Sequence, residues 1–263
     1  MAKLSCPFCG FGRSWSLRRK KRKCKSCRRE FGGNIYPVVG FRITTQIWKK
    51  VIATFLRERT EIRIAEEAGV TLKTAQKIAH HLRIRMTAVI PEPFTGIVEM
   101  DEAYVGGQRK NKKLHIRRVQ GKRGHGTDKL PIVGLFSREA GQVYVEVEPK
   151  KLDIKYIFKT VKERIAPYAK IYTDGFKMYR GLSKLGYIHE FVDHDGDEFV
   201  RGDIHTNNIE GFWGIMKRKL GCIGGMRRDR LYLFVGEIVW KFNHRNLSLK
   251  DRERALMKLL TRG

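Results

Sequence analysis

Three acidic residues stand where a site for two divalent metal ions would need them. Asp101 falls at the end of an apolar run that starts at Gly96, and Asp174 ends a second run that starts at Ala169. Glu210 lies inside a stretch with helical periodicity. Carboxylate oxygens are the ligands that Mg²⁺ and Mn²⁺ prefer, and a pair of such ions supports phosphoryl transfer. A single Asp or Glu is most often a surface residue, so the hypothesis depends on the three together.

The helical stretch also supplies a basic residue. At about 100° per residue, Glu210 and Lys217 lie together at the edge of an apolar stripe, seven residues apart and too distant for the usual helical ion pair. We expect Glu210 to reach toward the two aspartates and Lys217 to contact a phosphate beside the metal ions. The stripe itself consists of Ile209, Trp213, Met216 and Leu220.

Four of the five cysteines form two Cys-x-x-Cys pairs separated by fourteen residues. This is the spacing of a structural zinc ribbon, and a short polar segment such as residues 1–35 needs metal–thiolate bonds to fold. Disulfides and unrelated thiols are the competing interpretations. All four predicted ligands are protein groups, so the Zn²⁺ would be structural; they are Cys6, Cys9, Cys24 and Cys27.

The composition points to a polyanionic partner. The 263 residues carry a formal charge of +28, and basic residues are densest in the first third of the chain. Nucleic acid is the partner that this favours, with an anionic membrane surface as the competitor. We find no long apolar stretch, signal peptide or lipidation motif, which predicts a cytoplasmic protein with no membrane partner. The longest basic run is Arg18, Arg19, Lys20, Lys21, Arg22 and Lys23.

Residues 44–90 read as a helix-turn-helix region. Gly69 is suited to end one helix and Thr71 to cap the next. An ordinary helical hairpin would give the same pattern, but the neighbouring basic ribbon favours DNA binding. Residues 91–93 then form a linker with two prolines. The second helix would present Lys73, Thr74, Gln76 and Lys77 to DNA.

From residue 96 the pattern changes to strands rich in Val, Ile and Tyr, alternating later with helices. The order β-β-β-α-β-α-β-α predicts an α/β domain over residues 96–246, with a mixed five-stranded sheet of the ribonuclease H-like fold. Its first and fourth strands are neighbours, which would bring Asp101 beside Asp174. A helical tail follows at 247–263. We expect strands at 97–105, 131–137, 142–148, 170–173 and 188–192, and helices at 152–168, 176–185 and 206–220. The basic loop at 106–126 is expected to be either functional or disordered, with DNA as the partner against which it would order.

Several segments resemble bacterial insertion-sequence transposases of the DDE class, in the group related to Merlin transposons. The resemblance covers nearly the whole chain, and the string His-Thr-Asn-Asn-Ile-Glu-Gly-Phe-Trp at 205–213 is its most specific part. Some relatives carry Asn at the third metal position, and Asn207 and Asn208 lie nearby, but the helical face and the spacing to Lys217 favour Glu210. The other matching segments are 100–107, 172–176, 186–189 and 242–245.

The resemblance implies a metal triad of Asp101, Asp174 and Glu210, with Lys217 as the associated basic residue. It also implies two Mg²⁺ or Mn²⁺ ions, cleavage at transposon ends, and transfer of the freed strand to target DNA. The partners would be double-stranded DNA, as transposon ends and target, and further copies of the chain in a synaptic complex near a prokaryotic nucleoid. The alternatives are a domesticated or inactive transposase that regulates by binding DNA, and a junction-resolving nuclease of the same fold.

Overall fold

The structure is a computed structural model that describes residues 5–6, 8–18, 21–32, 37–38, 40–106, 129–147, 152–175, 177–179, 181–192, 201–223 and 227–261. Arg19, Lys20, His194 and all but the first residue of the basic loop lie outside this part. The chain forms two compact units, one of Met1–Leu82 with Ser248–Gly263 and one of Arg83–Leu247. Among the helices of the described part, none is long and apolar enough to cross a membrane.

The first unit begins with a small antiparallel sheet. Its strands β1 (Ser14–Ser16), β2 (Lys21–Cys24) and β3 (Glu30–Gly32) pair in that order. The buried core beneath them consists of Cys6, Cys24 and Phe31, with Cys27 packed against it. Because this core is so small, burial of apolar surface cannot by itself stabilise the segment.

Helices make up the rest of the first unit. Gly69, in the left-handed region at φ 68°, ends α2. The hydroxyl of Thr71 accepts a hydrogen bond from the Thr74 backbone N–H at 3.2 Å and so caps α3. Both features were predicted from the sequence. The C-terminal helix packs on α1, a contact that the sequence does not indicate. The helices are α1 (Thr45–Leu56), α2 (Glu61–Ala68), α3 (Leu72–Thr87), which continues past Leu82 into the second unit, and α8 (Leu249–Thr261).

The second unit contains the predicted five-stranded sheet, in the order β6-β5-β4-β7-β8. The first three strands are antiparallel, and the last two run parallel to β4. The predicted ribonuclease H-like strand order is therefore confirmed. So is the predicted adjacency of the first and fourth strands, which are β4 and β7. The strands are β4 (Ile97–Val105), β5 (Leu130–Ser137), β6 (Gln142–Val147), β7 (Lys170–Asp174) and β8 (Ile188–Val192).

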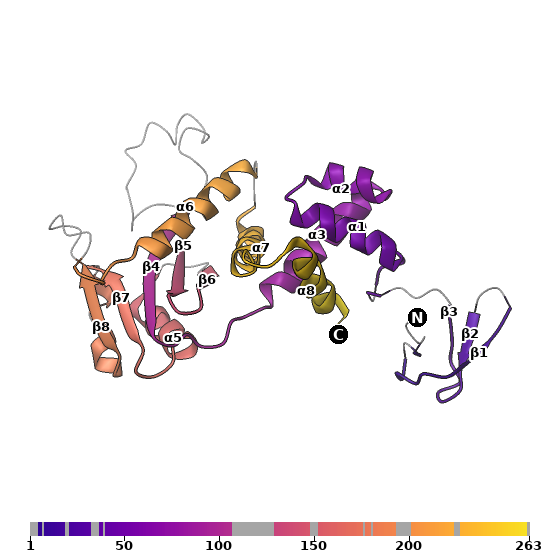
Figure 1. Ribbon diagram of the computed structural model, residues 1–263, viewed down its shortest axis with the longest axis horizontal. Coiled ribbons are helices and arrows are strands. Elements are labelled where there is room, and N and C mark those ends of the chain that lie inside the picture. The colour runs from indigo at the N-terminus through magenta and orange to yellow at the C-terminus, as the bar shows by residue number, and fades with distance from the viewer. Residues whose placement is uncertain are drawn as a thin grey trace. The chain divides into compact units, whose positions relative to one another are not determined.

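Helices cover both faces of this sheet (Figure 1). Alternate residues of β4 point to opposite faces. Val98 and Met100 pack in one core with α5 (Ile154–Arg164). Ala103 belongs to the other core, with the apolar stripe of α6 (Asn207–Cys222) and with α7 (Leu231–Asn243). All four predicted stripe residues of α6 are buried.

One element differs from the sequence expectations. The described part of 176–185 forms two 3-10 turns, η2 (Lys177–Tyr179) and η3 (Leu182–Leu185), so a single helix there was wrong. At Gly181 the chain lies close to α5, because a Cβ there would be 2.5 Å from the Phe158 ring and glycine has none. The strand expected at 97–105 has these bounds, and Asp101 lies in its middle, since pairing with β5 continues through Val105.

Candidate active site

Asp101 and Asp174 lie level with each other on neighbouring strands. The parallel register pairs Ile97 with Lys170 and Glu99 with Tyr172. Continued by two residues, it aligns Asp101 with Asp174, where β7 ends and β4 runs on. Both aspartates therefore belong to the face covered by α6.

A third carboxylate completes the cluster. One carboxylate oxygen from each of Asp101, Glu102 and Asp174 lies within 4.8 Å of the others. Glu102 belongs to the opposite face of β4, where the buried hydroxyl of Tyr179 donates a hydrogen bond to its Oε2. Side chains from both faces of β4 thus come together at the end of β7.

Asp101 is held by two donors. Trp213 Nε1 donates to Oδ2 at 2.9 Å, and the backbone N–H of Glu102 donates to Oδ1 at 2.7 Å. Burial, followed by the charges of Glu102 and Asp174, nevertheless raises the pKa of Asp101 from 3.8 to about 8. Three hard oxygen donors in mutual repulsion fit a divalent cation such as Mg²⁺ or Mn²⁺, which would compensate their charge.

The raised pKa of Asp101 predicts a pH-dependent affinity for Mg²⁺. Below pH 8 the metal must displace a proton, so the apparent affinity should fall about tenfold for each unit of pH between 8 and 6. The stability of the metal-free protein depends on pH in the opposite direction. Folding raises the pKa of Asp101, so this group stabilises the protein fully below its unfolded pKa, and the contribution is lost as the pH rises through 8. Thermal unfolding at pH 6 and pH 8 should therefore show a larger gain from Mg²⁺ at pH 8. Equal gains would contradict the expectation.

The start of α6 is fixed to the sheet by Glu99. This fully buried carboxylate accepts the backbone N–H groups of Asn208 at 2.9 Å and Ile209 at 3.1 Å. Arg138 Nε donates to it at 2.7 Å, and the Asn208 side-chain amide also donates at 2.7 Å. Glu99 thus accepts hydrogen bonds from first-turn N–H groups that have no acceptor within the helix. Its negative charge also interacts favourably with the positive end of the helix dipole. Arg138 also donates to the carbonyl of His205 at 2.9 Å, so the network extends into the segment before α6.

The two predicted residues of α6 are both exposed. Glu210 lies in the first turn, where its carboxylate accepts a hydrogen bond from the Thr206 hydroxyl at 2.7 Å. The three-residue acidic cluster does not include it. Lys217 lies two turns further along the helix. The roles of Glu210 and Lys217 in catalysis stay predictions. Asn208, the alternative third ligand, has its side-chain amide bound to Glu99.

Gly134 of β5 allows Trp213 to reach the aspartate. It pairs directly with Asp101, and a Cβ added there would lie 2.4 Å from the indole ring of Trp213. Any side chain at this position would therefore displace the ring that donates to Asp101.

Gly134→Ala should destabilise the protein by roughly 1–3 kcal/mol through overpacking and should weaken Mg²⁺ binding. Gly214→Ala is the matched control, because no atom lies within 4 Å of its added Cβ, and in a helix the change should stabilise by up to about 1 kcal/mol. Chemical denaturation and Mg²⁺ titration measure both effects. Equal stabilities for the two variants would show that Trp213 does not need the space above Gly134.

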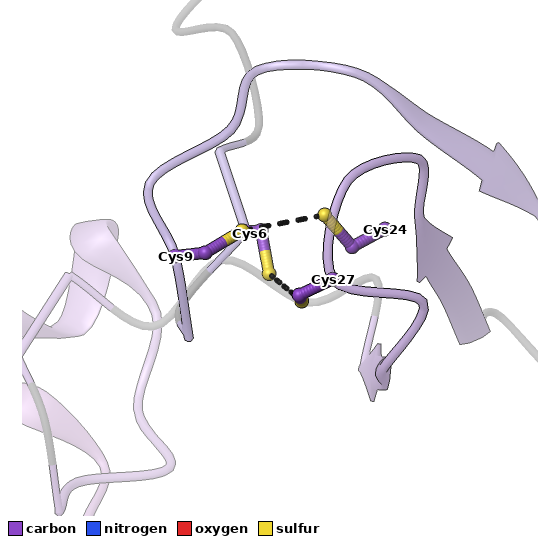
Figure 2. Close-up of side chains that lie close together, drawn as sticks. All are labelled: Cys6, Cys9, Cys24 and Cys27. Carbon is purple, nitrogen blue, oxygen red and sulfur yellow. Dashed lines mark hydrogen bonds between the residues drawn. The ribbon is translucent and has the colours of Figure 1, made fainter.

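The four paired cysteines converge in the first unit (Figure 2). The Sγ atoms of Cys6 and Cys27 are 3.6 Å apart, and those of Cys9 and Cys24 are 3.5 Å apart. A disulfide needs about 2 Å. Sulfurs bonded to one tetrahedral Zn²⁺ lie about 3.8 Å apart, so the four thiols fit that ion.

Removal of Zn²⁺ should unfold the ribbon and weaken DNA affinity without unfolding the second unit. The reason is the small core, which leaves metal–thiolate bonds as the main source of stability. Two-dimensional NMR during chelation should show the ribbon resonances collapse while those of the five-stranded sheet persist. Unchanged ribbon resonances would mean that the metal is not needed for this fold.

The remaining predicted residues are distributed over the first unit. In the basic run, Arg18 and Lys21 are exposed, whereas Arg22 and Lys23 are partly buried. On α3 the exposed predicted residues are Lys73, Gln76 and Lys77. Thr74 is partly buried, and its hydroxyl is hydrogen-bonded to that of Thr71 at 2.8 Å. DNA contact by these residues stays a prediction.

Sequence reasoning missed Glu99 and Glu102. The period of two in β4 places Glu99 on the same face as Asp101, so this signal could have identified it. The same period places Glu102 on the opposite face, and no sequence signal indicated that its carboxylate would lie close to those of Asp101 and Asp174. Two histidines near the site are hydrogen-bonded within the protein: His189 Nε2 is 2.9 Å from the Thr173 hydroxyl, and His205 Nδ1 is 2.9 Å from Arg138.

A ribonuclease H-like sheet with carboxylates on its first and fourth strands is the arrangement of a DDE-type nuclease or strand transferase. Residues 93–243 match the model of the ISXO2-like transposase domain, and the chain belongs to this family of DDE-class insertion-sequence transposases. It is therefore a DNA transposase.

Two relatives agree with this assignment. A protein in the transposable element ISH50 of Halobacterium salinarum is 30% identical over 217 residues, which cover 79% of this chain and 73% of the relative. A transposase-like protein of Haemophilus influenzae is 27% identical over 122 residues, which cover 46% of this chain and 95% of the relative.

Solved structures with some likeness include a chain of the simian T-cell lymphotropic virus intasome bound to PP2A regulatory subunit B56 gamma. It has 11% identity and a TM-score of 0.35, with 76% of this chain and 69% of that chain covered. The catalytic core domain of HTLV-2 integrase with magnesium has 9% identity and a TM-score of 0.32, with coverage of 56% and 84%. These scores are too low to support an inference about this chain, and the fold rests on the strand order.

Proposed function

We propose that this transposase binds the terminal inverted repeats of its element, cleaves one strand at each end, and joins the freed 3′-OH to target DNA. The observation that carries this proposal is the carboxylate cluster on β4 and β7. Two bound Mg²⁺ or Mn²⁺ ions would supply a nucleophilic water and stabilise the leaving oxygen.

In this proposal Asp101 and Asp174 hold the ions from the sheet, and Glu102 adds an oxygen from the other face of β4. Trp213 keeps the Asp101 carboxylate oriented. Glu210, from the first turn of α6, is the proposed third member of the triad. Lys217, on the same helix, would contact a phosphate next to the cleaved bond.

The first unit would recognise the DNA ends. Its support is the helix-turn-helix geometry, with exposed basic side chains on α3, and the basic zinc ribbon. Affinity should fall steeply with salt if many phosphates are neutralised. Joining two ends requires that they be brought together, so we propose a homo-oligomeric synaptic complex.

The test is cleavage of a labelled duplex that carries the element's terminal repeat. Wild-type protein should nick it at the element boundary with Mg²⁺ and not with a chelator in place of Mg²⁺. Binding without cleavage over a range of salt and metal conditions would favour the regulator instead. Footprinting separates the third possibility, since a junction-resolving nuclease would protect branched DNA irrespective of sequence.

A further inference from the structure

We propose that the zinc ribbon carries a stacking site for unpaired DNA bases. The site is an aromatic–basic patch, defined as Phe8, Trp15, Lys25, Arg28 and Arg29. The inference rests on the proposed function, which makes DNA the ligand. It adds unpaired bases as a second kind of ligand, beside the duplex that the helix-turn-helix would bind.

The aromatic side chains of the patch are exposed although the ribbon has little apolar core. Trp15 is 43% exposed and Phe8 is 53% exposed, and neither belongs to the core of Cys6, Cys24 and Phe31. Their rings therefore do not stabilise the fold by burial. Large exposed aromatic groups in so small a module indicate a binding surface.

The exposed rings lie among cations. Lys25 Nζ is 5.5 Å from the Trp15 ring centroid, and the guanidinium of Arg28 is 5.9 Å from it. Arg29 lies 5.3 Å from the Phe8 ring. Arg28 adopts a left-handed backbone at φ 61°, a conformation that costs a non-glycine residue energy. The adjacent Arg28 and Arg29 thus link the two rings into one surface.

The positive charge of the ribbon favours a polyanionic ligand. Residues 1–35 contain eleven lysines and arginines and one acidic residue, Glu30. Glu30 is itself 3.7 Å from Lys21. Lys23 pairs with Trp15 across the strands, so it belongs to the same face of the small sheet. A ligand of this surface must offer both negative charge and flat apolar groups.

Unpaired DNA meets both requirements. Its phosphates pair with the cations, and its exposed base faces stack on aromatic rings. In an intact duplex the base faces are covered by their neighbours, so phosphate contacts alone would leave Trp15 and Phe8 unused. Strand cleavage at an element end produces DNA in which bases can separate, which gives the patch its ligand.

Trp15 provides a direct measurement in the full-length, zinc-loaded protein. Of the four tryptophans, Trp48, Trp213 and Trp240 are at most 3% exposed, so acrylamide quenches the fluorescence of Trp15 selectively. Saturation with a fifteen-nucleotide oligo(dT) should protect it, whereas a duplex of the same length should protect it much less. Full quenching by acrylamide in the oligo(dT) complex would overturn the proposal.

Variants separate stacking from charge. Trp15→Ala should weaken oligo(dT) binding roughly 5- to 150-fold, as expected for loss of one stacked base, and leave duplex binding nearly unchanged. Trp15→Phe keeps a stacking face and should retain most of the affinity. Lys25→Ala should weaken both ligands together and reduce the salt slope by about one. Unchanged zinc content confirms folding of each variant.

Either of two results would reject the stacking site without touching the proposed function. One is a Trp15→Ala variant that binds oligo(dT) with wild-type affinity, and the other is an equal loss of affinity for oligo(dT) and for duplex. Metal-dependent cleavage of the end duplex is measured in parallel, because it tests the proposed function and does not depend on Trp15. Wild-type cleavage with no protection of Trp15 would refute the patch and keep the transposase mechanism.

Discussion

Asp101→Asn should lower the rate of DNA cleavage by roughly 10³-fold or more while leaving DNA binding intact. A metal-bound carboxylate is needed for several kcal/mol of charge stabilisation in the transition state, and about 1.4 kcal/mol corresponds to a factor of ten in rate. The same change relieves the repulsion among three carboxylates but replaces one of the two accepting oxygens of Asp101 by a donating amide group, so the stability of the metal-free protein should change little. Single-turnover cleavage and thermal unfolding measure the two effects.

Asp229→Asn is the control for this substitution. Asp229 is an exposed aspartate whose carboxylate pairs with Arg227 at 2.9 Å, and its loss should change neither cleavage nor stability appreciably. If Asp101→Asn lost DNA binding in step with cleavage, the aspartate would have a structural role rather than a metal-binding one.

Glu99→Ala should destabilise the second unit by roughly 3–5 kcal/mol, because it leaves Arg138 without its buried partner. It also removes the acceptor of two backbone N–H groups at the start of α6. Since Trp213 on this helix binds Asp101, cleavage should fall as well. Chemical denaturation measures the loss of stability, and Asp101→Asn provides the contrast of lost cleavage without lost stability.

Glu163→Ala is the matched control for Glu99. Glu163 forms a surface ion pair with Lys159 at 4.0 Å, and its removal should cost less than about 1 kcal/mol. Equal effects of the two substitutions would mean that the buried network does not fix the start of α6.

The sequence was sufficient for the order of the strands, because each of the five shows a dense run of β-branched or aromatic residues between turn signals. It was also sufficient to place Asp101 near Asp174, since the first and fourth strands are neighbours in the ribonuclease H-like fold that this order predicts. The apolar stripe of α6 followed from helical periodicity, and the burial of Ile209 and Trp213 agrees with it.

The remainder depended on contacts between distant segments. Gly181 lies against the ring of Phe158, more than twenty residues away, and nothing local indicates that approach. Glu102 joins the cluster from the other face of β4, beside the end of β7 at Asp174. Glu99 becomes the cap of α6 through hydrogen bonds that span more than one hundred residues. Local patterns define elements, whereas the distances between their side chains are set by packing.

The central claim is that Asp101 and Asp174 hold the divalent ions used in cleavage. The most direct measurement is Mn²⁺ binding followed by electron paramagnetic resonance, with zinc-loaded protein bound to the end duplex. We predict two tightly bound Mn²⁺ ions per wild-type chain and their loss in the Asp101→Asn, Asp174→Asn double variant, whose DNA affinity should be unchanged. Equal Mn²⁺ binding by wild type and the double variant would contradict the account.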